Sequence, residues 1–255
     1  MVADSAAYRR IATLMAHEGL LLRRAPGPLI GYTIMPLLLM VVLQPTLERL
    51  SRVSASDAGG TGQAAAGMAV MFSLFALKLV GADVLQERTW HTWDRLRASP
   101  ARLGDVLIGK AVPLLGVLVA HQFVIFGFAV AVFGLRPAGS WWAVVPVVLA
   151  WSSCVLVLGA AAATFVRSPA QLSAAGDIAA ILTSTLGGAL VPIAFLPNWL
   201  RAIAPISPGY WAMRCYRGVL DDPAGVPMMA SLAGLASFLV LGLIVTALLG
   251  RTRRA

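Results

Sequence analysis

The sequence predicts an all-α polytopic membrane protein, a single domain (residues 1–255) with six transmembrane helices. Hydrophobic residues make up 59% of the chain and charged residues 12%, and the mean hydropathy is +0.82. A soluble domain usually carries about 25% charged residues. Nearly every apolar block is also long enough for a helix to cross the hydrocarbon core of a bilayer, which takes about 20 residues.

Six apolar blocks predict the transmembrane helices, at residues 28–46, 62–82, 108–134, 141–166, 172–195 and 227–249. Clusters of Gly, Pro, Asp or Arg mark the turns between them. Ahead of the first block, residues 5–24 can place apolar side chains on one helical face with arginines at its margins. This pattern predicts an amphipathic helix in the membrane interface, with an ordinary cytoplasmic helix as the alternative.

The distribution of Lys and Arg predicts the orientation of the chain in a bacterial cytoplasmic membrane. Of these 20 residues, 13 lie on the side that carries both termini and six on the other side, while Lys78 lies inside the second predicted helix. Because cytoplasmic loops carry the excess of positive charge, both termini are expected in the cytoplasm. The net charge of +9 is thereby divided among membrane loops, which argues against a nucleic-acid partner.

The longest cytoplasmic connection, residues 83–110, predicts a short helix with an aromatic stripe. Trp90, Trp93 and Leu96 follow each other at intervals of three, and Ser99-Pro100 ends the helix. Charged residues, among them Asp94 and Arg95, border the stripe. Such a helix can dock on a soluble partner or lie at the membrane surface with its tryptophans among the headgroups, and the pattern leaves both open.

Residues 104–110 match GxxxxGK, the beginning of a phosphate-binding loop, but we expect no nucleotide site there. The complete motif continues with Ser or Thr, which binds magnesium, and here the next residue is Ala111. The match also leads straight into a predicted transmembrane helix, whereas a true phosphate-binding loop follows a strand of a soluble α/β domain. No cofactor is therefore expected in this chain.

Residues 187–220 begin inside the fifth predicted helix, break at Pro192, and then keep a high density of Pro, Trp and Leu. Irregular backbone at membrane depth is tolerated only against protein or a water-filled cavity, because its polar groups must be bonded internally. The extracytoplasmic segment 192–220 is therefore expected to be either a packed plug at the membrane surface or part of a transport path.

The cytoplasmic loop and this Pro-rich segment together resemble the permease subunits of type 2 ABC transporters, a mostly bacterial class of exporters. The matching residues in the loop are Glu87, Arg88, Thr92, Arg95, Leu96, Ser99 and Pro100. Asp94 stands where the family usually has Glu, and His91 stands where it has Gly. The matches in the second segment are Pro192-Ile193, Leu196-Pro197, Trp199-Leu200, Pro208 and Tyr210-Trp211.

The resemblance implies two permease copies, expected here as a homodimer, above two separate ATP-binding subunits that hold the ATP and magnesium. The first, second and fifth predicted helices would line the interface between the copies. The loop would be the coupling helix, seated in a groove of the ATPase through Glu87, Arg88, Trp90, Thr92, Trp93, Asp94, Arg95, Leu96 and Pro100. Short re-entrant helices would form an outer gate, with Pro192, Phe195, Leu196, Pro197, Trp199, Leu200 and Pro208.

Residues inside the predicted helices are candidates for the substrate path. His121 and Gln122 lie in the middle of the third helix, where they can face cargo or, as we favour, form an interhelical hydrogen bond. Lys78 is expected to snorkel toward the cytoplasm, with a pair to Asp177 left open. A soft apolar face on the second helix can accept varied partners, or simply pack or touch lipid; it consists of Met68, Met71, Phe72 and Phe75.

These features predict the membrane subunit of an ATP-driven exporter for a hydrophobic or amphipathic small molecule, such as a drug, antibiotic or natural product. The alternative within the family is export of a lipid-linked polysaccharide or glycolipid, but few Trp and Tyr residues lie at mid-depth. A membrane-embedded enzyme would need a cluster of ionisable residues at one depth, and an ion-coupled secondary transporter usually carries an internal repeat. The sequence shows neither feature.

Overall fold

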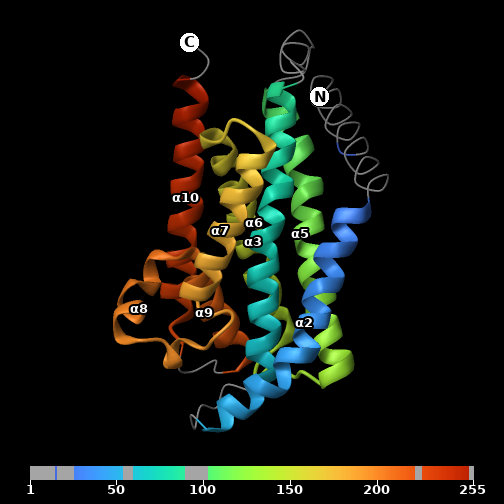
Figure 1. Ribbon diagram of the computed structural model, residues 1–255, viewed down its shortest axis with the longest axis vertical. Helices are drawn as coiled ribbons and strands as arrows, with labels where there is room; N and C mark the ends of the chain where they lie inside the picture. Colours follow the sequence, from blue (N-terminus) through green and yellow to red (C-terminus); the bar gives the residue numbers. More distant parts are fainter. Residues whose placement is uncertain (1–14, 16–25, 54–59, 90–102, 222–225, 253–255) are drawn as a thin grey trace, which may run out of the picture.

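The computed structural model is a bundle of long helices (Figure 1), and it describes residues 15, 26–53, 60–89, 103–221 and 226–252. All regular elements in these residues are helical, as predicted. The long helices are α2 (Pro26–Val53), α3 (Gly60–Thr89), α5 (Leu103–Phe133), α6 (Trp141–Phe165), α7 (Pro169–Leu186) and α10 (Met228–Thr252). Four short helices separate α7 from α10: η1 (Ile193–Phe195), α8 (Asn198–Ile203), η2 (Ala204–Ile206) and α9 (Pro208–Leu220).

Five of the described helices, α2, α3, α5, α6 and α10, are long and apolar enough to cross a membrane. The sixth predicted crossing corresponds to α7, which has 18 residues and runs beside the others in the bundle (Figure 1). At 1.5 Å per residue it is about 27 Å long, close to the thickness of the hydrocarbon core. The predicted end of this helix at residue 195 is wrong, because the helix stops at Leu186 and Gly188 follows with φ of 77°.

The connection between α3 and α5 is shorter than the predicted loop, residues 83–110. Helix α3 continues past the membrane-length part of the chain to Thr89, and α5 already begins at Leu103. The GxxxxGK match at residues 104–110 therefore lies within a continuous helix, unlike a phosphate-binding loop. The predicted interfacial helix at residues 5–24 falls, apart from Met15, outside the described residues and stays a prediction.

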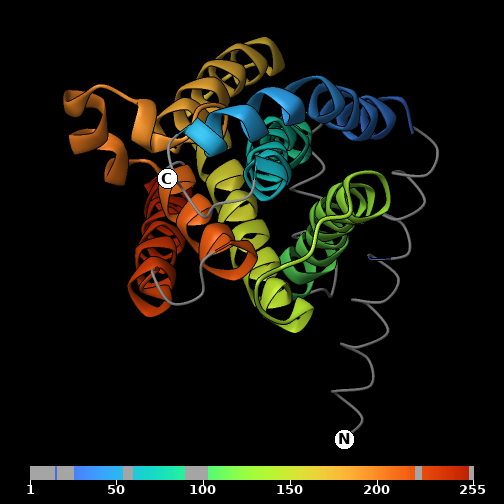
Figure 2. The same ribbon diagram turned by 90° about the horizontal axis from the view of Figure 1, so that it is seen from below.

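Helix α3 lies at the centre of the bundle, surrounded by α2, α5, α6 and α7 (Figure 2). In its most apolar 18-residue stretch, 88% of the residues are buried, compared with 17% in the corresponding stretch of α10. Small residues allow this close packing, since Ala64, Ala65, Ala66 and Ala69 are all fully buried. Helices that meet in a membrane use small residues in this way because lipid offers no hydrophobic drive for their association.

Gly67 on α3 marks the closest approach between the central helix and the chain that follows α7. A Cβ atom at this position would overlap the carbonyl oxygen of Ala189, a backbone atom that cannot move aside alone. Gly116 on α5 offers the opposite environment, because a Cβ atom there would meet no atom within 4 Å. The two glycines provide a matched pair for testing the packing around α3.

We expect Gly67→Ala to destabilise the folded chain by about 1–3 kcal/mol, since overpacking a tight contact forces backbone to shift. The effect is measured as a lower thermal midpoint of the purified protein in detergent. Gly116→Ala serves as the control and should leave the midpoint close to that of the unchanged chain. Equal midpoints for the two variants would contradict the close approach of Gly67 and Ala189.

Candidate functional site

The segment between α7 and α10 folds back beside the bundle as a series of short helices (Figure 1). Its start is a tight turn in which the amide nitrogens of Gly187 and Ala189 donate to the carbonyl oxygens of Thr183 and Ser184, at 2.8 and 2.9 Å. Gly188 takes a positive φ within this turn, a conformation that residues with a side chain rarely adopt. The short helices then begin at or just after Pro192, Pro197 and Pro208.

A buried amide on α3 holds this turn in place. Gln63 is 4% exposed, and its Nε2 donates a hydrogen bond of 2.7 Å to the carbonyl oxygen of Gly188. From α7, the carbonyl oxygen of Thr183 accepts a further bond of 2.9 Å from Ser207 Oγ. The turn is thus bonded from α3, and Ser207, further along the segment, is bonded to the end of α7. Irregular backbone at membrane depth requires internal partners of this kind.

The predicted outer-gate residues include both buried and exposed side chains. Leu196 is buried, and Pro192, Leu200 and Pro208 are partly buried. Phe195 and Trp199 have exposed fractions of 41% and 66%, and Ile203 and Ile206 beside them are exposed as well. A large apolar face of α8 and its neighbours therefore points away from the chain, and the gate assignment stays a prediction.

Helix α9 carries a polar and aromatic cluster close to α8. Arg214 donates from a guanidinium nitrogen to Tyr210 Oη at 2.9 Å, and its guanidinium lies 5.6 Å from the centre of the Tyr210 ring. Trp211 Nε1 donates to the carbonyl oxygen of Pro205 at 2.9 Å. The bond from Trp211 fastens α9 to η2, which precedes it, whereas the contact between Arg214 and Tyr210 lies within α9 itself.

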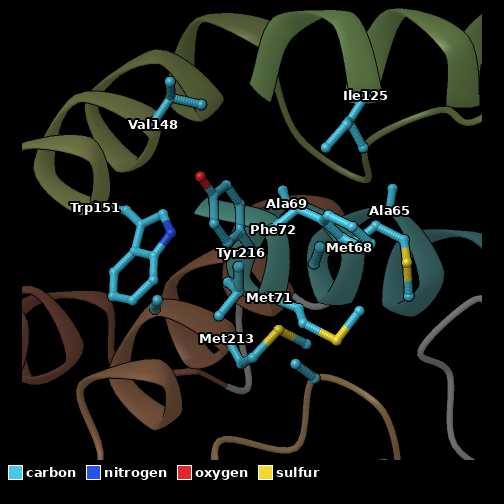
Figure 3. Packing of buried hydrophobic residues seen from close by; sticks show 14 of the residues in the cluster. Ala65, Met68, Ala69, Met71, Phe72, Ile125, Val148, Trp151, Met213 and Tyr216 are labelled. Carbon is cyan, nitrogen blue, oxygen red and sulfur yellow. The ribbon is translucent and has the colours of Figure 1, made fainter. Parts of the chain in front are cut away.

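A second buried network ties α9 to α5 and α6. Gln122 Nε2 donates to Ser152 Oγ at 2.6 Å, and the Tyr216 hydroxyl donates to Gln122 Oε1. All three side chains are fully buried. Figure 3 shows Tyr216 packed among the apolar core with its hydroxyl pointing toward α5 and α6. The expected interhelical hydrogen bond of Gln122 is therefore confirmed, and Tyr216 is a partner that the sequence analysis did not identify.

The soft apolar face of α3 is part of the core of the chain. Met68, Met71 and Phe72 are at most 6% exposed, and Figure 3 shows them gathered around Tyr216 and Met213. Of the alternatives left open, packing against neighbouring helices is therefore confirmed for these three side chains, and contact with lipid is excluded. Phe75, one turn further along, is only partly buried. Their role in a substrate path stays a prediction.

A charged pair lies nearer the predicted cytoplasmic end of the bundle. Lys78 Nζ on α3 is 2.6 Å from Asp177 Oδ1 on α7. The same ammonium lies 6.0 Å from the ring centres of Tyr32 and Phe75. His121 Nε2 is 3.0 Å from the carbonyl oxygen of Tyr32. The pair with Asp177, which the sequence analysis left open, is therefore found, and the snorkelling of Lys78 toward the cytoplasm stays a prediction.

The predicted coupling residues fall largely outside the structure's described part. Glu87 and Arg88 lie on the last turn of α3. The others fall between residues 90 and 102, outside the described residues: Trp90, Thr92, Trp93, Asp94, Arg95, Leu96 and Pro100.

No group of three or more His, Cys, Asp or Glu side chains that could hold a metal ion occurs among the described residues.

Comparison with known proteins relates this arrangement to membrane transport. Residues 9–220 match the family model described as ABC-2 type transporter. The linearmycin resistance permease protein LnrN of Bacillus subtilis is 25% identical over 203 residues, which cover 76% of this chain. These residues span about half, 51%, of the Bacillus protein. The probable doxorubicin resistance ABC transporter permease protein DrrC of Mycobacterium tuberculosis is 28% identical over 243 residues, 89% of this chain and 84% of that protein.

We expect Tyr216→Phe to destabilise the chain by about 1–3 kcal/mol, because it leaves the buried Oε1 of Gln122 without its donor. Tyr210→Phe, on the same helix, is the control and should cost less, since Tyr210 is only partly buried. The thermal midpoints of the two variants in detergent provide the comparison. A midpoint for Tyr216→Phe no lower than that for Tyr210→Phe would mean that the network does not hold α9.

Proposed function

This chain belongs to the ABC-2 type transporter family, and we propose that it is the membrane-spanning permease of an ATP-driven exporter. The proposed cargo is a hydrophobic or amphipathic small molecule, such as a drug, antibiotic or natural product. The family match over residues 9–220 carries this proposal. The names of the Bacillus and Mycobacterium relatives, both resistance permeases, support the class of cargo.

In the proposed assembly, two copies of this chain sit above two ATP-binding subunits, with both termini in the cytoplasm. The membrane subunit itself performs no covalent chemistry. Its task is to adopt two conformations that differ in their affinity for cargo or in the side from which cargo enters, because nucleotide shifts such a balance only through differential binding. Closure of the ATP-binding subunits would drive the switch as a movement of whole helices.

The path of α3 supports this mechanism. The helix runs without interruption from Gln63, which bonds the outer turn, to Glu87 and Arg88, where the predicted coupling segment begins. This distance is about 38 Å at 1.5 Å per residue, and a continuously hydrogen-bonded helix can carry a push along it as one body. Displacement of the coupling segment would therefore reach the turn at Gly188 directly.

Purification of the chain from native membranes in mild detergent tests the proposal. We expect an ATP-binding protein to co-purify in equal amount, with ATPase activity in the eluate. In proteoliposomes this complex should move an amphipathic dye only when ATP is supplied. A chain that purifies alone and supports no ATP-dependent transport would overturn the proposal.

Changes in the predicted coupling helix should separate transport from ATP hydrolysis. We expect Trp93→Ala and Arg95→Glu to lower transport at least tenfold while leaving the thermal midpoint unchanged, because a docking contact is lost and no membrane helix is altered. Transport and ATPase activity are measured on the same proteoliposomes. Normal transport by both variants would refute the coupling assignment.

Trp199→Ala tests the outer gate. The side chain is 66% exposed, so its removal should not unfold the chain but should alter leak or transport if the residue lies at the gate. Dye efflux with and without ATP measures both effects. Tyr210→Phe is a convenient comparison in the same segment, and unchanged efflux in Trp199→Ala would argue against a gate at this position.

A further inference from the structure

Lys78 and Asp177 form an ion pair at membrane depth with an unusual set of neighbours. The ammonium of Lys78 has a carboxylate oxygen at 2.6 Å and two aromatic rings, those of Tyr32 and Phe75, with centres at 6.0 Å. A carboxylate with aromatic walls is the set of groups that recognises an organic ammonium ion, through charge and through the negative faces of the rings. In this structure the ammonium is supplied by the chain itself.

Three helices build this site, and a glycine on one of them makes room for the lysine side chain. Gly176 on α7 leaves room for the lysine, since a Cβ atom there would lie 2.9 Å from Lys78 Cγ. Tyr32 on α2 is positioned from α5, where His121 Nε2 is 3.0 Å from its carbonyl oxygen. The site thus joins α2, α3 and α7 and is braced by α5.

Within the single chain, the pair is open to the face formed by α2, α3 and α7, which is the face expected to line the interface with a second copy. The side chains of Lys78 and Asp177 have exposed fractions of 20% and 40%, so neither is sealed within the core. Around them the surface is apolar, since α7 exposes Ile178 and Ile181 and α2 exposes Ile30 and Ile34. An accessible carboxylate in apolar surroundings suits a molecule with one positive group and a hydrophobic body.

We propose that this site recognises the primary or secondary ammonium group of amphipathic cargo, and that Lys78 occupies it when cargo is absent. The proposal rests on the exporter function and names the substrate class of that function. A lone carboxylate in a membrane is costly, so a resident ammonium keeps the empty site neutral. Cargo then exchanges one ammonium for another, and the site stays neutral throughout.

The length of the lysine side chain makes this exchange feasible. Lys78 lies four residues before Ala82, where the membrane-length part of α3 ends. Its four-carbon stem can extend along the helix and carry the ammonium toward the cytoplasmic interface. The side chain therefore has a second, hydrated position to occupy while cargo holds Asp177.

Binding of a matched pair of probes tests the proposal on the full chain in lipid nanodiscs, with empty nanodiscs subtracted. Dansylcadaverine carries a primary ammonium, and its N-acetyl form has the same fluorophore without the charge. The unchanged chain should bind the amine more tightly than the acetylated probe. Asp177→Asn should abolish this preference. Lys78→Gln should strengthen amine binding about fivefold, because the competing ion pair is removed.

Two control variants separate recognition from folding. The double variant Lys78→Gln/Asp177→Asn replaces the pair with neutral groups of similar size and should bind both probes equally at an unchanged thermal midpoint. Glu48→Gln removes a carboxylate near the opposite end of α2 and should leave the amine preference intact. Equal binding of the two probes to the unchanged chain would overturn the proposal. So would weaker binding of both probes to Lys78→Gln with a lowered midpoint, which would identify the pair as a packing element.

The exporter proposal is tested separately by co-purification and ATP-dependent transport. A complex that exports the acetylated dansyl probe with ATP but shows no preference for the amine would retain the exporter function and lose the ammonium site.

Discussion

The central position of α3 is the constraint on which the other elements depend. In its most apolar stretch 88% of the residues are buried, so most side chains there must fit a neighbouring element. Alanine and glycine fill much of its N-terminal half, and at Gly67 the approach is close enough to exclude a Cβ atom. Because lipid cannot drive helices together as water does, this fit between backbones supplies much of the association.

Two polar residues of α3, far apart along the helix, bind different partners on or beside α7. Near its N-terminal end, Gln63 bonds the turn at Gly188 and fixes the start of the segment between α7 and α10. Nearer its C-terminal end, Lys78 pairs with Asp177 on α7. Both contacts join α3 to α7 or to the turn that follows it. A movement of α3 relative to α7 would therefore change the turn at Gly188 and the charged pair together, as the proposed two-state mechanism needs.

The helical architecture was predictable because each membrane helix is encoded by its own continuous apolar block. Five of the described helices have the length and composition that a membrane crossing needs. The end of α7 differs from the prediction, because the Gly187-Gly188 turn stops the helix several residues before Pro192. Side-chain partners were harder still. Gln122 and Tyr216 are 94 residues apart, and Gln63 and Gly188 are 125 apart. A polar residue inside a transmembrane helix indicates that it has a hydrogen-bonding partner. A single sequence does not say which of several equally apolar helices supplies that partner.

Hydrogen–deuterium exchange of the chain in nanodiscs tests the role of α3 most directly. The amides of Gly187 and Ala189 are bonded within the turn that Gln63 holds. Replacement of Gln63 by Leu, which has a similar shape and cannot donate, should accelerate exchange at residues 187–193 and leave α10 unchanged. Equal exchange of this segment in both proteins would contradict the account, because the outer segment would then be held without the central helix.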